Sequence, residues 1–269
     1  MSSKISVPLV GAISFVVLQS TFSAVIRAEV TPPAAPRATP MQTGLSSLFA
    51  FGAASAADET VQALQGGGHD PHQNGFTVQN VELTLSGTVD PYWDAQANII
   101  MMIDAAGETV LELEEAFALS RGLPGGLQIK AGQFFTEFGR QNAQHPHTWA
   151  FVDQPLMLTR AFGPDGLRSQ GARLSWLAPT PWFSELYIGT QNANGETAVS
   201  FLSVPDEEVG SHVLQERRGR KASDLLYSLR WLNGFDAGDR ASVNLGLSAL
   251  RGPNTSGNET ITSIYGADA

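Results

Sequence analysis

The sequence contains no cysteine and few charged residues. Without cysteine the chain forms no disulfides, and 269 residues are enough to fold without them. Only 16% of the residues are charged, against about 25% in an ordinary soluble domain. The net charge of −10 argues against a nucleic-acid partner. A chain with so little charge and 27 glycines fits either a membrane β-barrel or a secreted β-sandwich.

The motifs of common catalytic sites are also missing. GxSxG, HExxH, the P-loop and the dinucleotide fingerprint do not occur in the sequence. Glu114 and Glu115 are adjacent carboxylates on an expected strand, where neighbouring side chains point to opposite faces. We therefore expect that they cannot work together as an acid–base pair. We expect no enzyme, no catalytic residue and no organic cofactor.

Long apolar runs are confined to the N-terminus. Residues 1–28 have the features of a cleaved signal peptide, with a positive charge at Lys4, an apolar run and small residues up to Ala28. The alternative is a transmembrane anchor, which Pro8 and Gly11 make less suitable. After the signal no run of 18 apolar residues follows, so we expect no later transmembrane helix.

Alternation of apolar and polar residues dominates the rest of the chain. Residues 29–42 form a Pro-rich linker, and we expect residues 43–269 to be all-β, because such alternation is the period of a strand with two different faces. In 109–119, for example, Leu113 and Phe117 are expected opposite Glu114. The expected strands are 43–55, 76–89, 94–104, 109–119, 127–138, 171–178, 182–191, 224–232, 241–250 and 259–268.

Short and long connections alternate between these strands. "DPYW", "RGLPGG", "APTPW" and "NGFDAGD" have the composition of tight turns. The connections between them are 56–75, 104–108, 140–170, 193–222 and 251–258, and only 104–108 is very short. This alternation is typical of an antiparallel transmembrane β-barrel in the bacterial outer membrane, with short periplasmic turns and long outer loops. A secreted β-sandwich binding module remains the alternative.

Aromatic residues cluster towards the ends of the expected strands, as in the aromatic girdles of membrane barrels. They are Tyr92, Trp93, Trp176, Trp182, Phe183, Tyr227 and Trp231. The chain ends in "IYGADA", without the terminal aromatic residue of many such barrels. About ten strands would then be the N-terminal part of a larger barrel, because closure must remove every free edge.

Several segments resemble a known family. "GFTVQNVELTLSGTVDPYWDAQANI", "LELEEAFA", "LPGGLQIKAGQFFTEFGRQNAQHPHTWAFVDQPLMLTRAFGPDG" and "GARLSWLAP" are similar to porin-like outer-membrane proteins of Gram-negative bacteria. These are often labelled zinc-regulated TonB-dependent outer-membrane receptors and are distantly like phosphate-selective porins. The resemblance implies a barrel that passes or takes up small solutes and responds to zinc. Residues 29–75 are too few for the plug of a TonB-dependent receptor, which favours a porin-like channel.

A channel needs a segment that narrows its pore and charged side chains that line it. We expect loop 140–170 to form a constriction with Trp149, Asp153 and Arg160. The expected pore-lining residues are Glu82, Glu112, Glu114, Lys130, Arg173 and Arg230. The expected partners are small solutes or ions and outer-membrane lipid, with "ERRGRK" (216–221) offering charges to lipopolysaccharide phosphates. A homo-oligomer is a further expectation.

Histidines suggest an alternative, a receptor that captures metal. His69, Asp70 and His72 lie in one Gly-rich segment, and His145 and His147 in another, and imidazole and carboxylate groups are ligands of Zn²⁺. We expect all five histidines to lie in outer loops and none on a strand. Loops that converge over a barrel mouth would bring the two groups together. The competing interpretation is that loop 140–170 folds into the lumen and its histidines bond to backbone.

Overall fold

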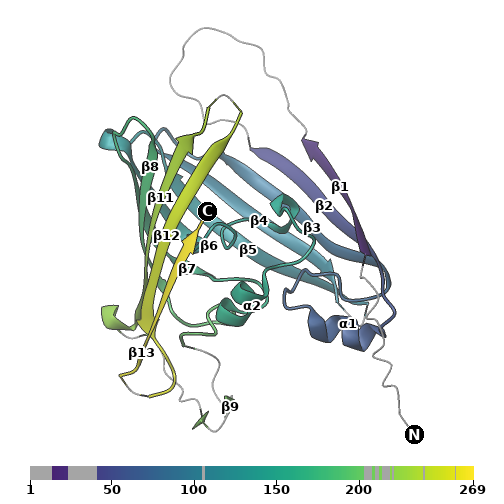
Figure 1. Cartoon of the computed structure of the whole chain (residues 1–269). Helices are drawn as coiled ribbons and strands as arrows, with labels where there is room; N and C mark the ends of the chain where they lie inside the picture. The colour runs from purple at the N-terminus through teal and green to yellow at the C-terminus, as the bar shows by residue number, and fades with distance from the viewer. Residues whose placement is uncertain are drawn as a thin grey trace, which may run out of the picture.

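One curved antiparallel sheet forms most of the molecule (Figure 1). The computed structural model describes residues 14–23, 41–104, 107–202, 208–209, 212–213, 219, 221–238, 240–257 and 259–269. Eleven strands follow one another in the order β1-β2-β3-β4-β5-β6-β7-β8-β11-β12-β13. Their bounds are β1 Ser14–Ser23, β2 Gln42–Ala53, β3 Gly75–Thr88, β4 Trp93–Ile103, β5 Thr109–Ser120, β6 Leu127–Phe135, β7 Arg168–Leu177, β8 Phe183–Asn192, β11 Leu225–Asp236, β12 Ser242–Pro253 and β13 Ile261–Asp268. The all-β expectation is confirmed, and within the described residues the sheet is open, with β1 and β13 at its edges.

Helices are few and short. They are α1 Asp58–Leu64 and α2 Leu156–Phe162, with the 3₁₀ turns η1 Pro124–Gly126, η2 Pro146–Thr148 and η3 Ala222–Asp224. None of the helices in the described part of the chain has the length and apolar character to cross a membrane. The remaining strands, β9 Glu208–Val209 and β10 His212–Val213, pair with each other and with no other strand among the described residues. The expectation that no histidine lies on a strand is therefore wrong for His212.

All the strands expected from the alternation are present. They correspond to β2–β8 and β11–β13, with ends that differ by a few residues. β1 was not expected, because its residues 14–23 fall inside the expected signal peptide; in the uncleaved chain they pair along β2. Most of the expected linker, 29–42, lies outside the described residues, and Gln42 already belongs to β2.

The connections separate into two ends of the sheet. The tight turns that follow β3, β5, β7 and β11 lie at the upper end in Figure 1. The connections with α1, α2 and the β9–β10 ribbon lie at the lower end. The expected alternation of short and long connections is thus confirmed as an arrangement in space.

The two faces of the sheet differ in chemistry. Cross-strand register places Leu174 beside Ile188 and Ile188 beside Leu229 on one face, where they are 40%, 51% and 45% exposed. Arg173, the residue before Leu174 on β7, pairs with Lys130 of β6 on the opposite, concave face. Because side chains alternate along each strand, the register builds continuous apolar rows on one side and polar groups on the other.

A β-bulge in β5 breaks this alternation. Asn98 of β4 faces Glu115, whereas the next residue, Ile99, faces Leu113, so Glu114 is an extra residue in its strand. Glu114 and Glu115 are both turned to the concave side and are 1% and 4% exposed. The expectation that they point to opposite faces is wrong because of this bulge. The bulge also brings Phe117 to the concave side, where Lys130 Nζ lies 3.9 Å from its ring centroid.

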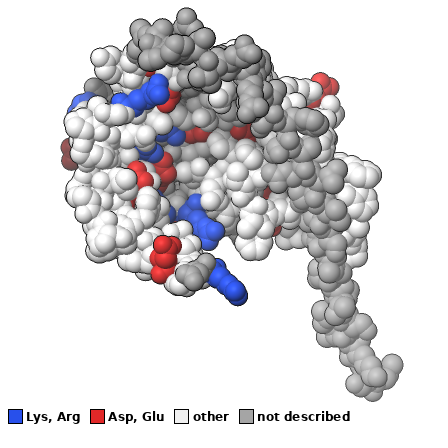
Figure 2. Space-filling model, turned by 90° about the horizontal axis from the view of Figure 1, so that it is seen from above, with Lys and Arg blue, Asp and Glu red and all other residues white. Residues whose placement is uncertain are grey.

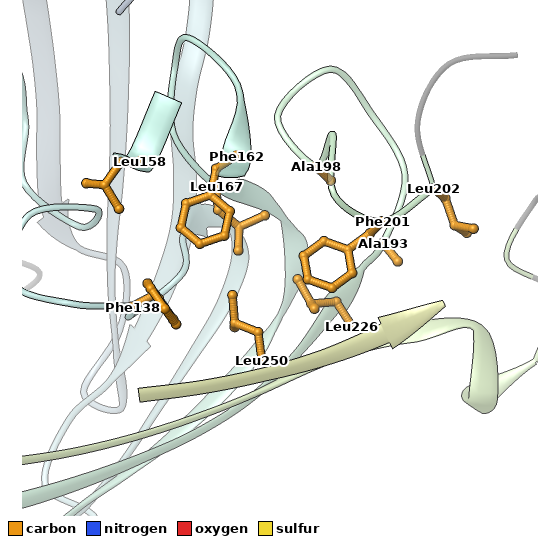
Figure 3. Close-up of a cluster of buried hydrophobic side chains, with 10 residues drawn as sticks. All are labelled: Phe138, Leu158, Phe162, Leu167, Ala193, Ala198, Phe201, Leu202, Leu226 and Leu250. Carbon is orange, nitrogen blue, oxygen red and sulfur yellow. The ribbon is translucent and has the colours of Figure 1, made fainter. Parts of the chain in front are cut away.

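The hydrophobic core lies on the concave side of the sheet, not between two sheets (Figure 3). Residues 136–167, between β6 and β7, fold back onto this side and are called the inward-folded segment. Their apolar residues meet part of the connection 193–224 and strands β11 and β12. The cluster contains Phe138, Leu158, Phe162, Leu167, Ala193, Ala198, Phe201, Leu202, Leu226 and Leu250.

Phe162 is the residue whose truncation tests this core. Its side chain is fully buried and packs edge-on against Phe138, with 5.2 Å between ring centroids. We expect Phe162→Ala to destabilise the inward-folded segment by about 3–5 kcal/mol. Protease cleavage within residues 136–167 should accelerate, because cleavage follows the population of the locally open form. Met157→Ala, on the exposed side of the same helix, should leave the cleavage rate unchanged.

Candidate functional site

The inward-folded segment spans the concave side of the sheet. Near its start, the backbone N–H of Gly139 donates to Ser248 Oγ of β12 at 3.1 Å. Phe138 lies against Gly266 of β13, where a Cβ atom would come within 2.8 Å of the ring, so a side chain there would displace it. Further along, His147 Nδ1 lies 3.5 Å from Ser46 Oγ of β2. The segment therefore contacts strands near both edges of the sheet.

A 3₁₀ turn sets the two histidines of this segment side by side. Pro146 occupies the first position of η2, where proline has no N–H to lose and its fixed φ suits the turn. The backbone N–H and hydroxyl of Thr148 both donate to the carbonyl of His145, at 2.9 and 2.8 Å. The rings of His145 and His147 stack with 5.7 Å between centroids. Both imidazoles are thereby directed towards the same part of the sheet.

Three glutamates of the sheet meet these imidazoles. His145 Nδ1 lies 2.7 Å from Glu114 Oε2 and 3.5 Å from Glu82 Oε2, and its Nε2 lies 3.0 Å from Glu115 Oε2. His147 Nδ1 lies 2.9 Å from Glu82 Oε2. The carboxylates come from β3 and β5, and the imidazoles from the inward-folded segment. We call Glu82, Glu114, Glu115, His145 and His147 the His–Glu cluster.

A second layer holds these carboxylates in place. Asn98 donates to Glu82 Oε1 at 2.5 Å, and the backbone N–H of Phe135 donates to Glu115 Oε1 at 3.0 Å. Lys130 Nζ lies 3.4 Å from the same Glu115 oxygen. The guanidinium of Arg168 forms a close ion pair with Glu112 and lies 3.7 Å from Glu114 Oε1. Buried carboxylates need such partners, because an unpaired buried charge costs several kcal/mol.

Charge balance determines the protonation state of His145. Burial lowers the pKa of the imidazole, but the carboxylates of Glu114 and Glu115 at its two ring nitrogens outweigh this effect and raise the pKa to about 10. His145 is therefore an imidazolium at neutral pH. The ring of Phe135 meets it edge-on, with 5.7 Å between centroids, and covers it from one side.

The expected pore-lining residues all face the concave side, most of them in ion pairs. Lys130 pairs with Glu115, and Glu112 with Arg168. Arg173 Nη1 lies 2.5 Å from Glu137 Oε1, and Arg230 Nη1 lies 2.7 Å from Asp268 Oδ2. Glu82 and Glu114 belong to the His–Glu cluster. Figure 2 looks into the hollow of the sheet and shows blue and red side chains gathered within mostly white walls.

The three residues expected at a constriction lie on the inward-folded segment. Trp149 is half-buried, and its indole N–H donates to the carbonyl of Gln144 at 2.9 Å. Asp153 and Arg160 are exposed. Trp149 thus stabilises the fold of the segment itself, whereas the two charged side chains remain accessible to solvent.

The second group of expected metal ligands is His69, Asp70 and His72. These side chains do not converge as those of the His–Glu cluster do. Asp70 Oδ2 and Oδ1 accept backbone N–H bonds from Gly67 and Gln154, both at 2.7 Å. His72 Nδ1 lies 3.3 Å from the carbonyl of Asp70, and His69 Nδ1 lies 3.3 Å from the carbonyl of Gln79. Asp70 therefore ties its loop to the inward-folded segment. His69 approaches the cluster only by lining a small cavity that Glu114 also lines.

The interpretation that the histidines of loop 140–170 bond to backbone is wrong for both His145 and His147. His69 and His72 contact backbone carbonyls, whereas His145 and His147 contact carboxylates. Sequence reasoning missed Glu115 and Arg168 as members of the site. The two adjacent glutamates in "LELEEAF" were the available signal, but only the bulge in β5 turns both side chains to the concave face.

Comparisons with known proteins give one match. A relative from Aquifex aeolicus (strain VF5), described as an uncharacterized protein, is 42% identical over 139 residues. The match covers 50% of this chain and 28% of the relative, so the chain spans less than a third of the relative's length. No protein-family model and no solved structure matches the chain. The resemblance to porin-like proteins therefore stays a prediction.

The raised pKa of His145 predicts how stability depends on pH. The folded pKa of about 10 lies above the unfolded value of 6.5. The charged imidazole therefore stabilises the fold fully below pH 6.5, and this contribution disappears as pH rises through 10. We expect His145→Gln to be less stable than wild type at pH 6.5, on the order of a few kcal/mol. The difference should shrink towards pH 10.

Denaturant unfolding with a chelator present measures this difference. His72→Gln is the matched control and should follow the wild-type curve at every pH. A wild-type advantage over His145→Gln that stays constant from pH 6.5 to pH 10 would contradict a buried imidazolium.

Proposed function

We propose that the chain is the channel-forming part of a bacterial outer-membrane β-barrel, reached by a cleaved export signal, through which small hydrophilic solutes diffuse. The observation that carries this proposal is the contrast between the two faces of the sheet. Apolar rows such as Leu174, Ile188 and Leu229 suit contact with lipid. Charged side chains on the concave face suit a water-containing lumen.

Exposed aromatic side chains support a membrane setting. Near the tight turns, Tyr92, Trp182 and Phe183 are 70%, 42% and 44% exposed. Near the other end of the strands, Phe51 and Phe76 lie with 5.0 Å between ring centroids and are exposed. Aromatic residues at both ends of the strands match the two girdles that a barrel places at the membrane–water interfaces.

The inward-folded segment is the proposed constriction. It contacts β2 through His147 and β12 through Gly139, so it lies across the path that a solute would take along the concave side. Exposed Asp153 and Arg160 would face that path and set its local field. The ion pairs of the sheet wall would hold the segment in place.

Closure of the barrel is part of the proposal. A sheet in lipid cannot leave backbone donors and acceptors unpaired. Cleavage of the signal would remove β1, so the edges at β2 and β13 need partner strands. We propose that further strands of a longer protein supply them. The matched region is 28% of the relative, which leaves ample length for such strands. Outer-membrane lipid, lipopolysaccharide and further copies of the protein would be the partners of the closed barrel.

Membrane localisation is the first test. We expect the full protein to be found in the outer-membrane fraction, soluble only in detergent, with a mobility in gel electrophoresis that changes on heating. These properties follow from a closed barrel that resists unfolding by detergent. A water-soluble monomer would favour a secreted β-sandwich and contradict the proposal.

Ion selectivity in planar bilayers tests the constriction. Arg160→Glu, in the inward-folded segment, should shift the reversal potential towards cation selectivity, because it reverses a charge beside the solute path. Arg240→Glu makes the same change of charge at a tight turn and should have little effect. Asp153→Lys should shift selectivity towards anions. If Arg160→Glu and Arg240→Glu behave alike, the segment is not the constriction.

A further inference from the structure

Three ligand atoms of the His–Glu cluster converge in one small region. Glu82 and Glu114 each offer a carboxylate oxygen and His145 offers a ring nitrogen, and these atoms all lie within 4.8 Å of one another. Glu82 comes from β3, Glu114 from the bulge of β5, and His145 from the inward-folded segment. Imidazole nitrogen and carboxylate oxygen are ligands that Zn²⁺ accepts.

The atoms that converge contact one another as charged groups, without well-formed hydrogen bonds. Glu82 Oε2, Glu114 Oε2 and His145 Nδ1 are buried and make no hydrogen bond of acceptable geometry, although they lie at ion-pair distances. Glu82 and Glu114 are each 1% exposed. The other oxygen of Glu82 is well satisfied by Asn98. Each side chain thus directs an incompletely satisfied atom towards the same point.

We propose that Glu82, Glu114 and His145 form a binding site for a divalent transition-metal ion of the Zn²⁺ class. His147, whose Nδ1 lies 2.9 Å from Glu82 Oε2, is positioned to become a fourth ligand. Metal–ligand distances of about 2.0–2.2 Å separate the ligands of a tetrahedral ion by about 3.3–3.5 Å. The separation of His145 Nδ1 from Glu82 Oε2 already matches at 3.5 Å, and that from Glu114 Oε2 must widen from 2.7 Å.

Charge supports a divalent ion at this point. Four carboxylates, those of Glu82, Glu112, Glu114 and Glu115, face two basic side chains, Lys130 and Arg168. A divalent ion that displaces the proton of the His145 imidazolium would lie beside neutral imidazole ligands and would bring this group to zero net charge. The imidazole ligands favour Zn²⁺ over Ca²⁺ and Mg²⁺, which prefer oxygen ligands alone.

The site would join the sheet wall to the inward-folded segment. Two of its ligands belong to strands and one to the segment, so a bound ion would fix the segment against the wall. The proposed metal site does not require that the protein forms a channel, because zinc binding can be measured without conductance. A protein that binds zinc but forms no channel would contradict only the proposed function.

Zinc titration of the full protein in detergent, followed by competition with a chromophoric chelator, tests the site. Wild type should bind one Zn²⁺ per chain, and the affinity for Ca²⁺ and Mg²⁺ should be much lower. His145→Gln and Glu82→Gln should each weaken Zn²⁺ binding at least about tenfold. His72→Gln, in the other histidine-containing loop, should leave the affinity unchanged.

Co²⁺ provides a second readout at the same site. A tetrahedral site with nitrogen and oxygen ligands should give visible absorption bands in wild type and in His72→Gln, and weak bands in His145→Gln. Denaturant unfolding identifies variants that fail to fold, whether or not the protein is a barrel. If a variant fails to fold, the wild-type titration still decides whether zinc binds. The proposal is overturned if wild type binds no Zn²⁺, or if binding is lost in His72→Gln and retained in His145→Gln.

Discussion

The burial of three glutamates beside one imidazolium is the constraint on which the rest of this structure depends. A carboxylate removed from water destabilises a fold by several kcal/mol unless opposite charges and hydrogen bonds compensate. Here Glu82, Glu114 and Glu115 converge on His145, which the chain delivers from a segment folded back from the end of β6. Without the segment the carboxylates would lose this partner, and without the carboxylates the imidazole would lose its charge. The wall and the segment therefore stabilise each other.

Much of the fold could be predicted from the sequence, because strand periodicity is a local property. Apolar and polar residues alternate wherever one face meets a different environment from the other, and tight turns need Gly, Pro, Asp and Asn. The positions of Lys130, Arg173 and Arg230 on the concave face followed from that alternation alone. The pairing of residues 14–23 with β2 could not be predicted, since the same apolar residues also fit an export signal.

The site was only partly predictable, because two non-local features create it. The bulge in β5 turns Glu114 and Glu115 to the same side, and nothing in the local sequence requires an extra residue there. The path of the inward-folded segment depends on contacts with distant strands, such as Ser46 and Ser248. His145 and His147 were recognised as a pair, but their carboxylate partners could be identified only once β3, β5 and the segment were placed together.

Disulfide trapping tests most directly whether the segment lies against the sheet. The chain has no cysteine, so Ser46→Cys with His147→Cys creates a single possible pair, at two positions where Ser46 Oγ and His147 Nδ1 lie 3.5 Å apart. In the folded protein under mild oxidation, we predict a cross-link between β2 and the segment, visible as a mobility shift that reductant reverses. Neither single variant should show the shift. A folded double variant that stays uncross-linked would show that the segment does not lie against the wall.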